Sequence, residues 1–304
     1  MNEKKSIISI YDKMAYQLLP NIGFTNATNF CSEICNTDSL GLRFNDKQKN
    51  YTSIFEENFI NKKPEIIITG GSTAMGMASS SDKKTLSSLL SQSSNFHFYN
   101  LAVRAYNGFQ ELIITQSLIS RFKNLKKIFI VSGINDLYFF FDPNFQKIFP
   151  GPQVYGSKFY KINKEHLNFF QRVRFYFENT KKIEINHKIT LKEVLNRNLK
   201  LWSLFAKSQS VEVFYFLQPF YTWNLNNLNI LAKEKMNYGS SEIMNKIDNS
   251  YNYFKDMLSD ACRNNDIKFK DLNELSFKKN VFVDRVHLND DGFEEIAEEL
   301  KKYL

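Results

Sequence analysis

The chain has 304 residues, a length that allows one or two domains and a large buried core. Its 40 basic and 32 acidic residues leave a net charge of +8, which is spread along the chain and forms no block of like charges. No recognised nucleic-acid-binding motif accompanies this charge, so we expect no nucleic-acid partner.

Cysteine and histidine usage argues against disulfides and metals. The three cysteines, Cys31, Cys35 and Cys262, are an odd number, and no second Cys/His pair stands near Cys31 and Cys35. The N-terminus fits no signal peptide, and no apolar run reaches the roughly eighteen residues that a membrane-spanning helix needs. We therefore expect no metal site, no cofactor, no transmembrane segment and a cytoplasmic location.

Apolar patterning predicts an α/β protein. Residues 1–60 are expected to form a largely irregular N-terminal segment that packs on the core, and 61–304 the main domain. Strands alternate with helices along the main domain, which predicts a mostly parallel sheet of about five strands covered on both faces. In chain order we predict a strand at 65–69, a helix at 79–92, strands at 96–101 and 127–132 around a helix at 108–122, a helix at 189–207, a strand at 211–217, a helix at 241–263, a strand at 267–272 and a last helix after Asn289.

Asp284 and His287 stand just before the last predicted helix and form a candidate base with its orienting group. At this spacing, one short loop can present both side chains together. The carboxylate can accept a hydrogen bond from one imidazole nitrogen and leave the other free to take a proton from a nucleophile. The pair alone is a weak signal, because Asp-x-x-His is frequent by chance.

Ser72 is the candidate nucleophile. It follows Gly70 and Gly71 directly after the strand predicted at 65–69. The glycines allow a sharp turn, and the carboxyl ends of strands in an open α/β sheet border the crevice where ligands bind. A Gly-Ser loop without chemistry is the plain alternative. No Gly-Lys-Ser/Thr follows, so the turn is not a phosphate loop.

Two other strand ends offer hydrogen-bond donors for an oxyanion. Asn135 follows the strand at 127–132, and its side-chain amide can be aimed at a developing negative charge. The turn around Ala105, after the strand at 96–101, can add a backbone N–H. Alternatively, Asn135 caps the next element and the Ala105 turn is an ordinary strand–helix connection.

In order and spacing, these segments resemble the SGNH (GDSL-type) hydrolase family, in its large bacterial branch. The resemblance runs from about residue 19 to the C-terminus and implies a flavodoxin-like three-layer α/β/α sandwich. The family blocks appear as Gly70-Gly71-Ser72-Thr73, Asn100-Leu101-Ala102-Val103-Arg104-Ala105, Gly133-Ile134-Asn135-Asp136 and Asp284 to His287.

The resemblance implies a role for each matching residue. Ser72 would be the nucleophile, with Asp284 and His287 completing a triad, and Ser72, Ala105 and Asn135 would form the oxyanion hole. Two positions depart from the family pattern: Gly71 replaces the usual Asp, and Ala105 stands where a glycine is expected. Its methyl group would crowd the site or narrow the acyl pocket, whereas its N–H survives.

An aromatic-rich insertion is expected at 138–187. Residues 138–177 include 14 aromatic side chains, a far higher share than the 15% of the whole chain. Because the insertion starts directly after the Asn135 block, we predict substrate contacts from Tyr138 and Phe139, and from Tyr106 in the neighbouring turn. The insertion suits a lid or sugar platform, a peripheral membrane contact, or a satellite core, and the sequence does not choose among them.

The predicted function is that of a serine esterase that hydrolyses O-acyl groups, O-acetyl above all, of a carbohydrate or glycoconjugate. The chemistry follows from the four blocks, and the substrate class only from the resemblance. An O-acyltransferase with the same site, and a non-catalytic glycan- or membrane-associated module that retains the fold, are the alternatives.

Overall fold

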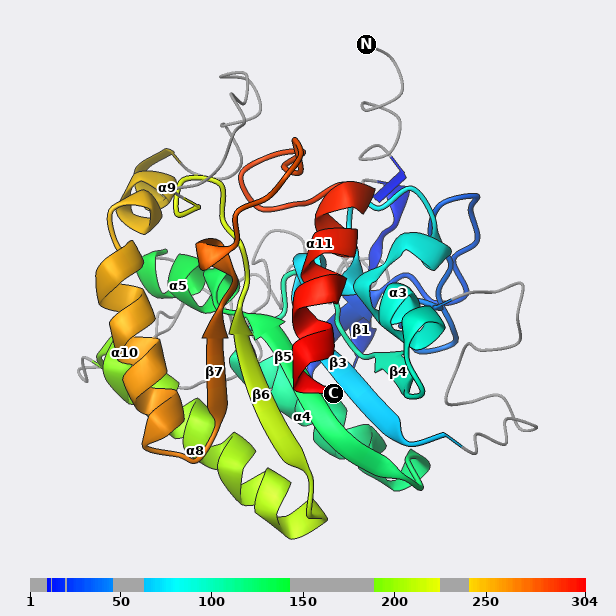
Figure 1. The fold of residues 1–304 in the computed structure, drawn as a ribbon, viewed down its shortest axis with the longest axis horizontal. Helices are drawn as coiled ribbons and strands as arrows, with labels where there is room; N and C mark the ends of the chain where they lie inside the picture. Colours follow the sequence, from blue (N-terminus) through cyan, green and yellow to red (C-terminus); the bar gives the residue numbers. More distant parts are fainter. Residues whose placement is uncertain (1–9, 12, 20, 46–62, 143–188, 225–240) are drawn as a thin grey trace, which may run out of the picture.

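A five-stranded parallel sheet forms the centre of the protein (Figure 1). The computed structural model describes residues 10–11, 13–19, 21–45, 63–142, 189–224 and 241–304. The strand order is β4-β3-β5-β6-β7, and every neighbouring pair is parallel. The strands are β3 (Glu65–Gly70), β4 (His97–Asn100), β5 (Leu125–Ser132), β6 (Glu212–Leu217) and β7 (Lys268–Asp271), which confirms the predicted parallel α/β sheet.

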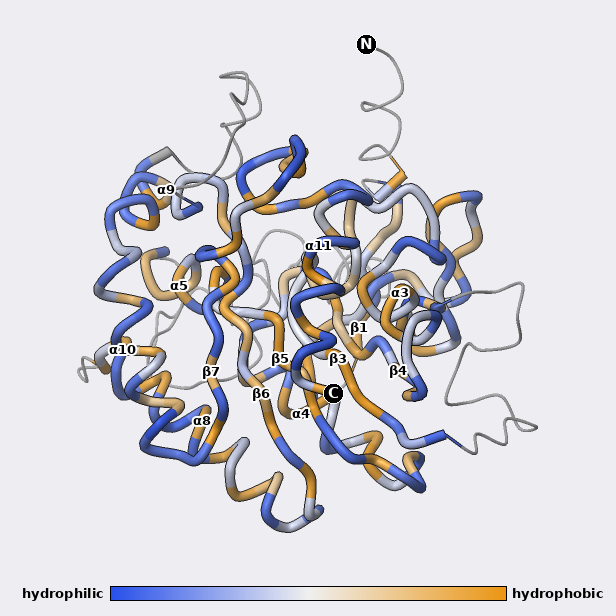
Figure 2. The backbone as a smooth tube through the Cα atoms, viewed as in Figure 1, coloured by the Kyte–Doolittle hydropathy of each residue, from blue (hydrophilic) through white to orange (hydrophobic). Residues whose placement is uncertain are grey.

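Side-chain alternation along the strands divides the core into two clusters, one on each face of the sheet. Ile67, Ile128 and Tyr215 belong to the first cluster, whereas their chain neighbours Ile68 and Phe129 belong to the second. Both faces are therefore apolar, as a parallel sheet between two helical layers requires. Figure 2 shows β3, β5 and β6 as largely hydrophobic tubes, whereas the edge strand β7 is mainly hydrophilic.

Two helical layers cover the sheet (Figure 1). The first cluster is completed by α4 (Gly108–Leu118), α5 (Ile134–Phe141), α8 (Leu191–Gln209), α9 (Ser241–Asp248) and α10 (Tyr251–Arg263). The second is completed by α2 (Ser72–Met75), α3 (Leu86–Ser93) and α11 (Asp290–Leu300). Short 3-10 turns stand at Asp82–Lys84, Ile119–Arg121, Leu272–Glu274 and Lys301–Tyr303. Among the described residues, no helix is long and apolar enough to cross a membrane.

Local capping explains where two predicted helices differ from the observed ones. The helix expected from residue 79 begins at Leu86, because Thr85 accepts a hydrogen bond from the backbone N–H of Ser88 and caps the helix. The helix expected at 241–263 is divided into α9 and α10. Asn249 and Ser250 direct side-chain donors to carbonyls of the last turn of α9, which ends that helix.

The described part of the N-terminal segment includes an antiparallel hairpin that the sequence did not predict, β1 (Tyr16–Leu19) with β2 (Gly23–Asn26). Two buried arginines fix this segment to the main domain. Arg104 donates to the Asn26 side chain at 3.0 Å and to backbone carbonyls of residues 11 and 14. Arg43 pairs with Asp82 at 2.8 Å and donates to the carbonyl of residue 76.

Candidate active site

The candidate nucleophile lies at the carboxyl edge of the sheet, where β3 ends and α2 begins. Gly70 has a φ of +152°, and a Cβ at this position would come within 2.2 Å of the Val131 carbonyl oxygen. Glycine is therefore required for the chain to turn so closely past β5. The turn presents Ser72 as the first residue of α2, half-buried, with a backbone N–H that has no acceptor within the helix.

Ser72, His287 and Asp284 form a continuous chain of hydrogen bonds. Ser72 Oγ lies 2.8 Å from His287 Nε2, and His287 Nδ1 lies 2.7 Å from Asp284 Oδ2. The other carboxylate oxygen of Asp284 accepts the backbone N–H groups of Val286 and His287 at 2.7 and 2.8 Å. Both carboxylate oxygens are thus fixed, and the imidazole is held with one nitrogen directed at the serine.

Electrostatics keep Asp284 in its charged form. Burial raises the pKa of this carboxyl group. The neighbouring His287 and the N–H hydrogen bonds outweigh that effect and leave the pKa below its usual value. Asp284 is therefore ionised at neutral pH and able to stabilise a positive charge on the imidazole.

The two candidate oxyanion elements meet the nucleophile turn at Gly71. Asn135 is the second residue of α5, and its Nδ2 donates to the Tyr106 carbonyl oxygen at 2.8 Å. A Cβ added to Gly71 would lie 2.4 Å from Asn135 Nδ2 and 3.7 Å from that carbonyl oxygen. The Val103 N–H donates to the Gly70 carbonyl at 3.2 Å and joins the second block to the first. All four sequence blocks therefore converge at one edge of the sheet.

In this chain, a side chain at position 71 has no room unless the Asn135 amide moves. The backbone of Gly71 has φ −86°, which other residues can adopt, so only the space taken by Asn135 excludes a side chain. We expect Gly71→Ala to displace the flexible Asn135 amide and to lower esterase kcat by about 10²-fold, the usual effect of losing one oxyanion donor. The melting temperature should change little.

Asn135→Ala provides the matched control for this prediction, because it removes the same amide without adding a methyl group. The double variant should be about as slow as either single variant. Independent, multiplicative losses in Gly71→Ala and Asn135→Ala would show that Gly71 does not act through Asn135.

Ala105 occupies a left-handed backbone conformation, with φ +64°. This conformation favours glycine, the residue that the sequence resemblance led us to expect at this position. Ala105 is only 7% exposed and belongs to the first core cluster, so its methyl group contacts mainly protein. The sequence had suggested that the methyl crowds the site or narrows the acyl pocket, and this burial limits that effect.

We expect Ala105→Gly to keep the hydrolysis rate of p-nitrophenyl acetate within about threefold of wild type, because the N–H and its geometry survive. Relief of the left-handed strain and loss of the buried methyl nearly offset each other in stability. The butyrate-to-acetate rate ratio should rise less than twofold. A rise of tenfold or more, absent in the control Ala102→Gly, would show that the methyl limits the acyl pocket.

A polar contact that the sequence did not reveal joins the nucleophile turn to the His287 loop. Thr73 Oγ1 donates to the Val286 carbonyl oxygen at 3.2 Å and accepts from Gln218 Nε2 at 3.0 Å. Gln218 directly follows β6 and is 2% exposed. No local pattern marks such a pair, because Gln218 lies 145 residues from Thr73. The sequence signal for Gln218 was its position directly after the strand predicted at 211–217.

The three residues predicted to contact the substrate, Tyr106, Tyr138 and Phe139, differ in their burial. Tyr106 is fully buried in the first core cluster, and its hydroxyl donates to the Phe24 carbonyl oxygen at 2.7 Å. Phe139 is buried, and Tyr138 is half-buried beside it on α5. The rest of the predicted insertion, from residue 143, lies outside the described residues.

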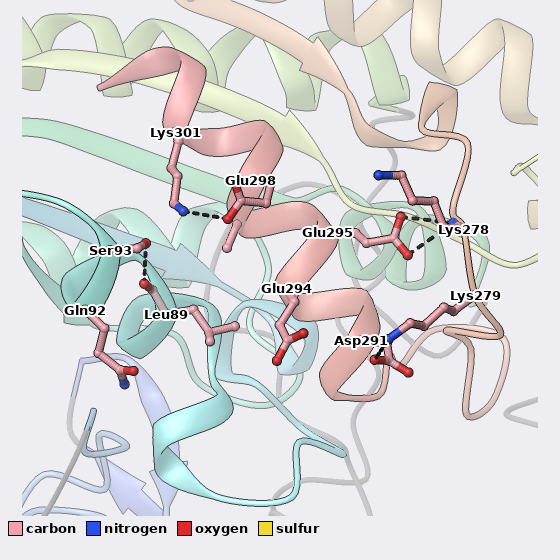
Figure 3. A pocket seen from close by; sticks show the side chains of 11 residues that line it. Leu89, Gln92, Ser93, Lys278, Lys279, Asp291, Glu294, Glu295, Glu298 and Lys301 are labelled. Atoms are coloured by element: carbon pink, nitrogen blue, oxygen red, sulfur yellow. Dashed lines mark hydrogen bonds and ion pairs between the residues drawn. The ribbon is translucent and has the colours of Figure 1, made fainter.

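A groove of about 410 Å³ elsewhere on the surface includes none of the predicted site residues (Figure 3). It lies between α3 and α11, and charged side chains of both signs line it. Lys279 pairs with Asp291 at 2.6 Å and Lys301 with Glu298 at 2.5 Å, so these charges are already neutralised within the protein. The residues that line the groove include no histidine and no cysteine.

Metal and disulfide chemistry find little support in the described part of the chain. It includes no group of three His, Cys, Asp or Glu side chains placed to hold a metal ion. None of the three cysteines forms a disulfide; Cys35 and Cys262 are buried and Cys31 is exposed.

Comparisons with known proteins identify similar structures only. No protein-family model matches the chain, and no curated protein is similar to it in sequence. The acetyl xylan esterase AlAXEase has 12% identity over 79% of this chain and 99% of its own, with a TM-score of 0.45. An extracellular lipase from Streptomyces rimosus has 12% identity over 79% and 100%, also at 0.45. A carbohydrate acetylesterase family member from Sinorhizobium meliloti has 12% identity over 79% and 96%, at 0.44.

Likenesses of this strength do not establish a substrate. The sequence blocks and their positions in this structure are the stronger observation. Each block stands at the carboxyl edge of the same parallel sheet, and the Ser, His and Asp side chains are joined by hydrogen bonds. The chain is an α/β protein with a parallel sheet, and the residues that the sequence resemblance singled out lie together at the carboxyl edge of that sheet.

Proposed function

We propose that this protein is a serine esterase in which Ser72, His287 and Asp284 act as a triad. The observation that carries the proposal is the hydrogen-bond chain from Ser72 Oγ to His287 Nε2 and from His287 Nδ1 to Asp284, at 2.8 and 2.7 Å. These distances suit proton transfer from the hydroxyl to the imidazole. Asp284 is charged, and it orients the ring through the second nitrogen.

The reaction would proceed through an acyl-enzyme. Ser72 Oγ attacks the ester carbonyl carbon while its proton passes to His287 Nε2, and the tetrahedral intermediate forms with a negative oxygen. The imidazolium then gives the proton to the leaving alcohol as the carbon–oxygen bond breaks. Water attacks the acyl-serine in the same way, which releases the carboxylic acid and restores Ser72.

The oxyanion would be stabilised by the Ser72 and Ala105 N–H groups and by the side-chain amide of Asn135. One hydrogen of Asn135 Nδ2 is directed to the Tyr106 carbonyl, which leaves the second for the oxyanion. Each donor of this kind is worth roughly 3–4 kcal/mol of transition-state stabilisation.

The proposed substrate is an O-acyl ester, O-acetyl above all, of a carbohydrate or glycoconjugate. This part of the proposal rests on the resemblance of the four blocks to large bacterial SGNH proteins. Transfer of the acyl group to a sugar hydroxyl would use the same acyl-serine, with the sugar oxygen in place of water in the second step.

Hydrolysis of p-nitrophenyl acetate by wild type and by Ser72→Ala tests the proposal. We expect measurable turnover in the wild type and none above background in the variant, with melting temperatures that agree. Comparable turnover in the two proteins would remove Ser72 from the nucleophile role. Turnover with and without a sugar acceptor then separates hydrolysis from transfer, because an acceptor speeds deacylation only if transfer occurs.

A further inference from the structure

Asp136 directly follows the oxyanion residue Asn135, and its carboxylate faces the segment that carries the other oxyanion donor. Both oxygens of Asp136 accept the backbone N–H of Gly108, each at 3.1 Å. Gly108 is the first residue of α4 and follows Ala105 by three positions. Asp136 is only 8% exposed.

Two consecutive residues of α5 therefore hold the turn between β4 and α4. Asn135 donates to the carbonyl of Tyr106, and Asp136 accepts from the N–H of Gly108. On the other side, Val103 is bonded to Gly70 beside the nucleophile. Ala105 lies between these attachments, so its N–H is fixed relative to both Asn135 and Ser72.

Holding this carboxylate inside the protein is costly. Burial raises the pKa of Asp136 to about 6, even though the Gly108 N–H acts in the opposite direction. Burial also raises the pKa of Glu111 well above its usual value, and the neighbouring Asp136 adds to that rise, so Glu111 is neutral when Asp136 is charged. Ser132 donates to Glu111 Oε1 at 2.6 Å, and Tyr215 lies in the same interior region.

The direction of the pKa shift of Asp136 shows whether its ionised carboxylate stabilises the folded protein. A carboxyl group whose pKa is higher in the folded protein than in the unfolded chain gives stability at low pH. That stability is lost as the pH rises from the unfolded value of about 4 toward 6. At pH 8 the ionised Asp136 therefore lowers the net stability, although its hydrogen bonds hold the turn.

We propose that Asp136 is a positioning residue that holds the Ala105 turn against Asn135 in the geometry needed for the oxyanion. The inference rests on the proposed esterase function for its kinetic consequence. The geometric part, in which the 105–108 segment is ordered by this carboxylate, stands independently of the activity.

Asp136→Asn tests the role, with Glu111→Gln as the matched control in the same interior cluster. The asparagine keeps the volume but loses the charge and one acceptor, whereas the glutamine copies the neutral form that Glu111 already has. At pH 8 we expect Asp136→Asn to lower kcat for p-nitrophenyl acetate tenfold or more, with KM within about twofold and a melting temperature no lower than wild type. Glu111→Gln should keep kcat within about twofold.

A second pair of variants tests the donor of this contact, the Gly108 N–H: the proline variant removes it and the alanine variant keeps it. Proline is tolerated at the first position of a helix, and Asn107 has the extended conformation, ψ 170°, that a residue before proline needs. Gly108→Pro should thus lose the N–H and reproduce the kcat loss. Gly108→Ala adds a similar Cβ, 3.3 Å from Asp136 Oδ2, while it keeps the N–H, and should lose less.

Amide hydrogen exchange of the segment 103–108 provides a readout that needs no activity. The segment should exchange faster in Asp136→Asn than in wild type, and at the wild-type rate in Glu111→Gln. Unchanged exchange, or a folded Asp136→Asn with wild-type kcat, would overturn the positioning role. If wild type shows no Ser72-dependent turnover but exchange changes as expected, the esterase proposal fails and the positioning of the turn stands.

Discussion

His287→Ala is expected to lower kcat for p-nitrophenyl acetate by on the order of 10⁴–10⁶-fold, the range seen when a member of a serine triad is removed. In the described part of the chain, the imidazole nitrogen Nε2 lies at hydrogen-bond distance, 2.8 Å, from Ser72 Oγ. Without it, the serine hydroxyl has no base at neutral pH. Steady-state kinetics beside Ser72→Ala would measure the effect.

The double variant Ser72→Ala/His287→Ala should be scarcely slower than either single variant, because the two side chains act in one proton transfer. The two losses would multiply if the residues contributed separately, and that result would contradict a shared mechanism. Circular dichroism spectra and melting temperatures of the three proteins serve as controls for folding, since His287 is fully buried.

Asp284→Asn is expected to lower kcat about 10⁴-fold while KM changes little. The asparagine can keep the loop bonds to the N–H groups of Val286 and His287 through its oxygen. Its NH₂ group then faces His287 Nδ1 and favours the tautomer with the proton on Nε2, which cannot accept from Ser72. Single-turnover acylation of Ser72 would report this loss directly.

An effect of less than about tenfold in Asp284→Asn would contradict this triad and favour a Ser–His pair oriented by another acceptor. Asp290→Asn is a suitable control, since Asp290 lies in the same region but binds Ser80 instead of the imidazole. Its kcat should stay near that of wild type.

Local patterns in the sequence were sufficient to predict the sheet and to single out the Ser, His and Asp residues that lie within hydrogen-bond distance at its edge. Strand β3 is a β-branched run with every residue buried, and such runs have few alternatives to a central parallel strand. Gly70 and Ser72 stand at its end, so the strand prediction also placed the nucleophile. The parallel topology then brings the ends of β4 and β5 to the same edge, whatever the intervening loops do.

Features that depend on long-range packing were not predictable from local patterns. The Thr73–Gln218 contact, the fit of Asn135 against Gly71 and the buried position of Tyr106 are set by residues from distant segments. An aromatic residue in a motif turn suggested a substrate contact, but packing against β2 decided its position. The same applies to the β1–β2 hairpin, whose short strands carry little apolar periodicity.

Arg104 connects the turn that carries Ala105 to the N-terminal segment of the protein. Arg104 directly precedes Ala105 and is buried, and the hydrogen-bond acceptors of its guanidinium all belong to residues 11–26. A protein shortened to residues 61–304 would lose all three of these acceptors, beside the turn that carries Ala105. The described residues of the N-terminal segment are therefore packed in one unit with the turn that carries Ala105.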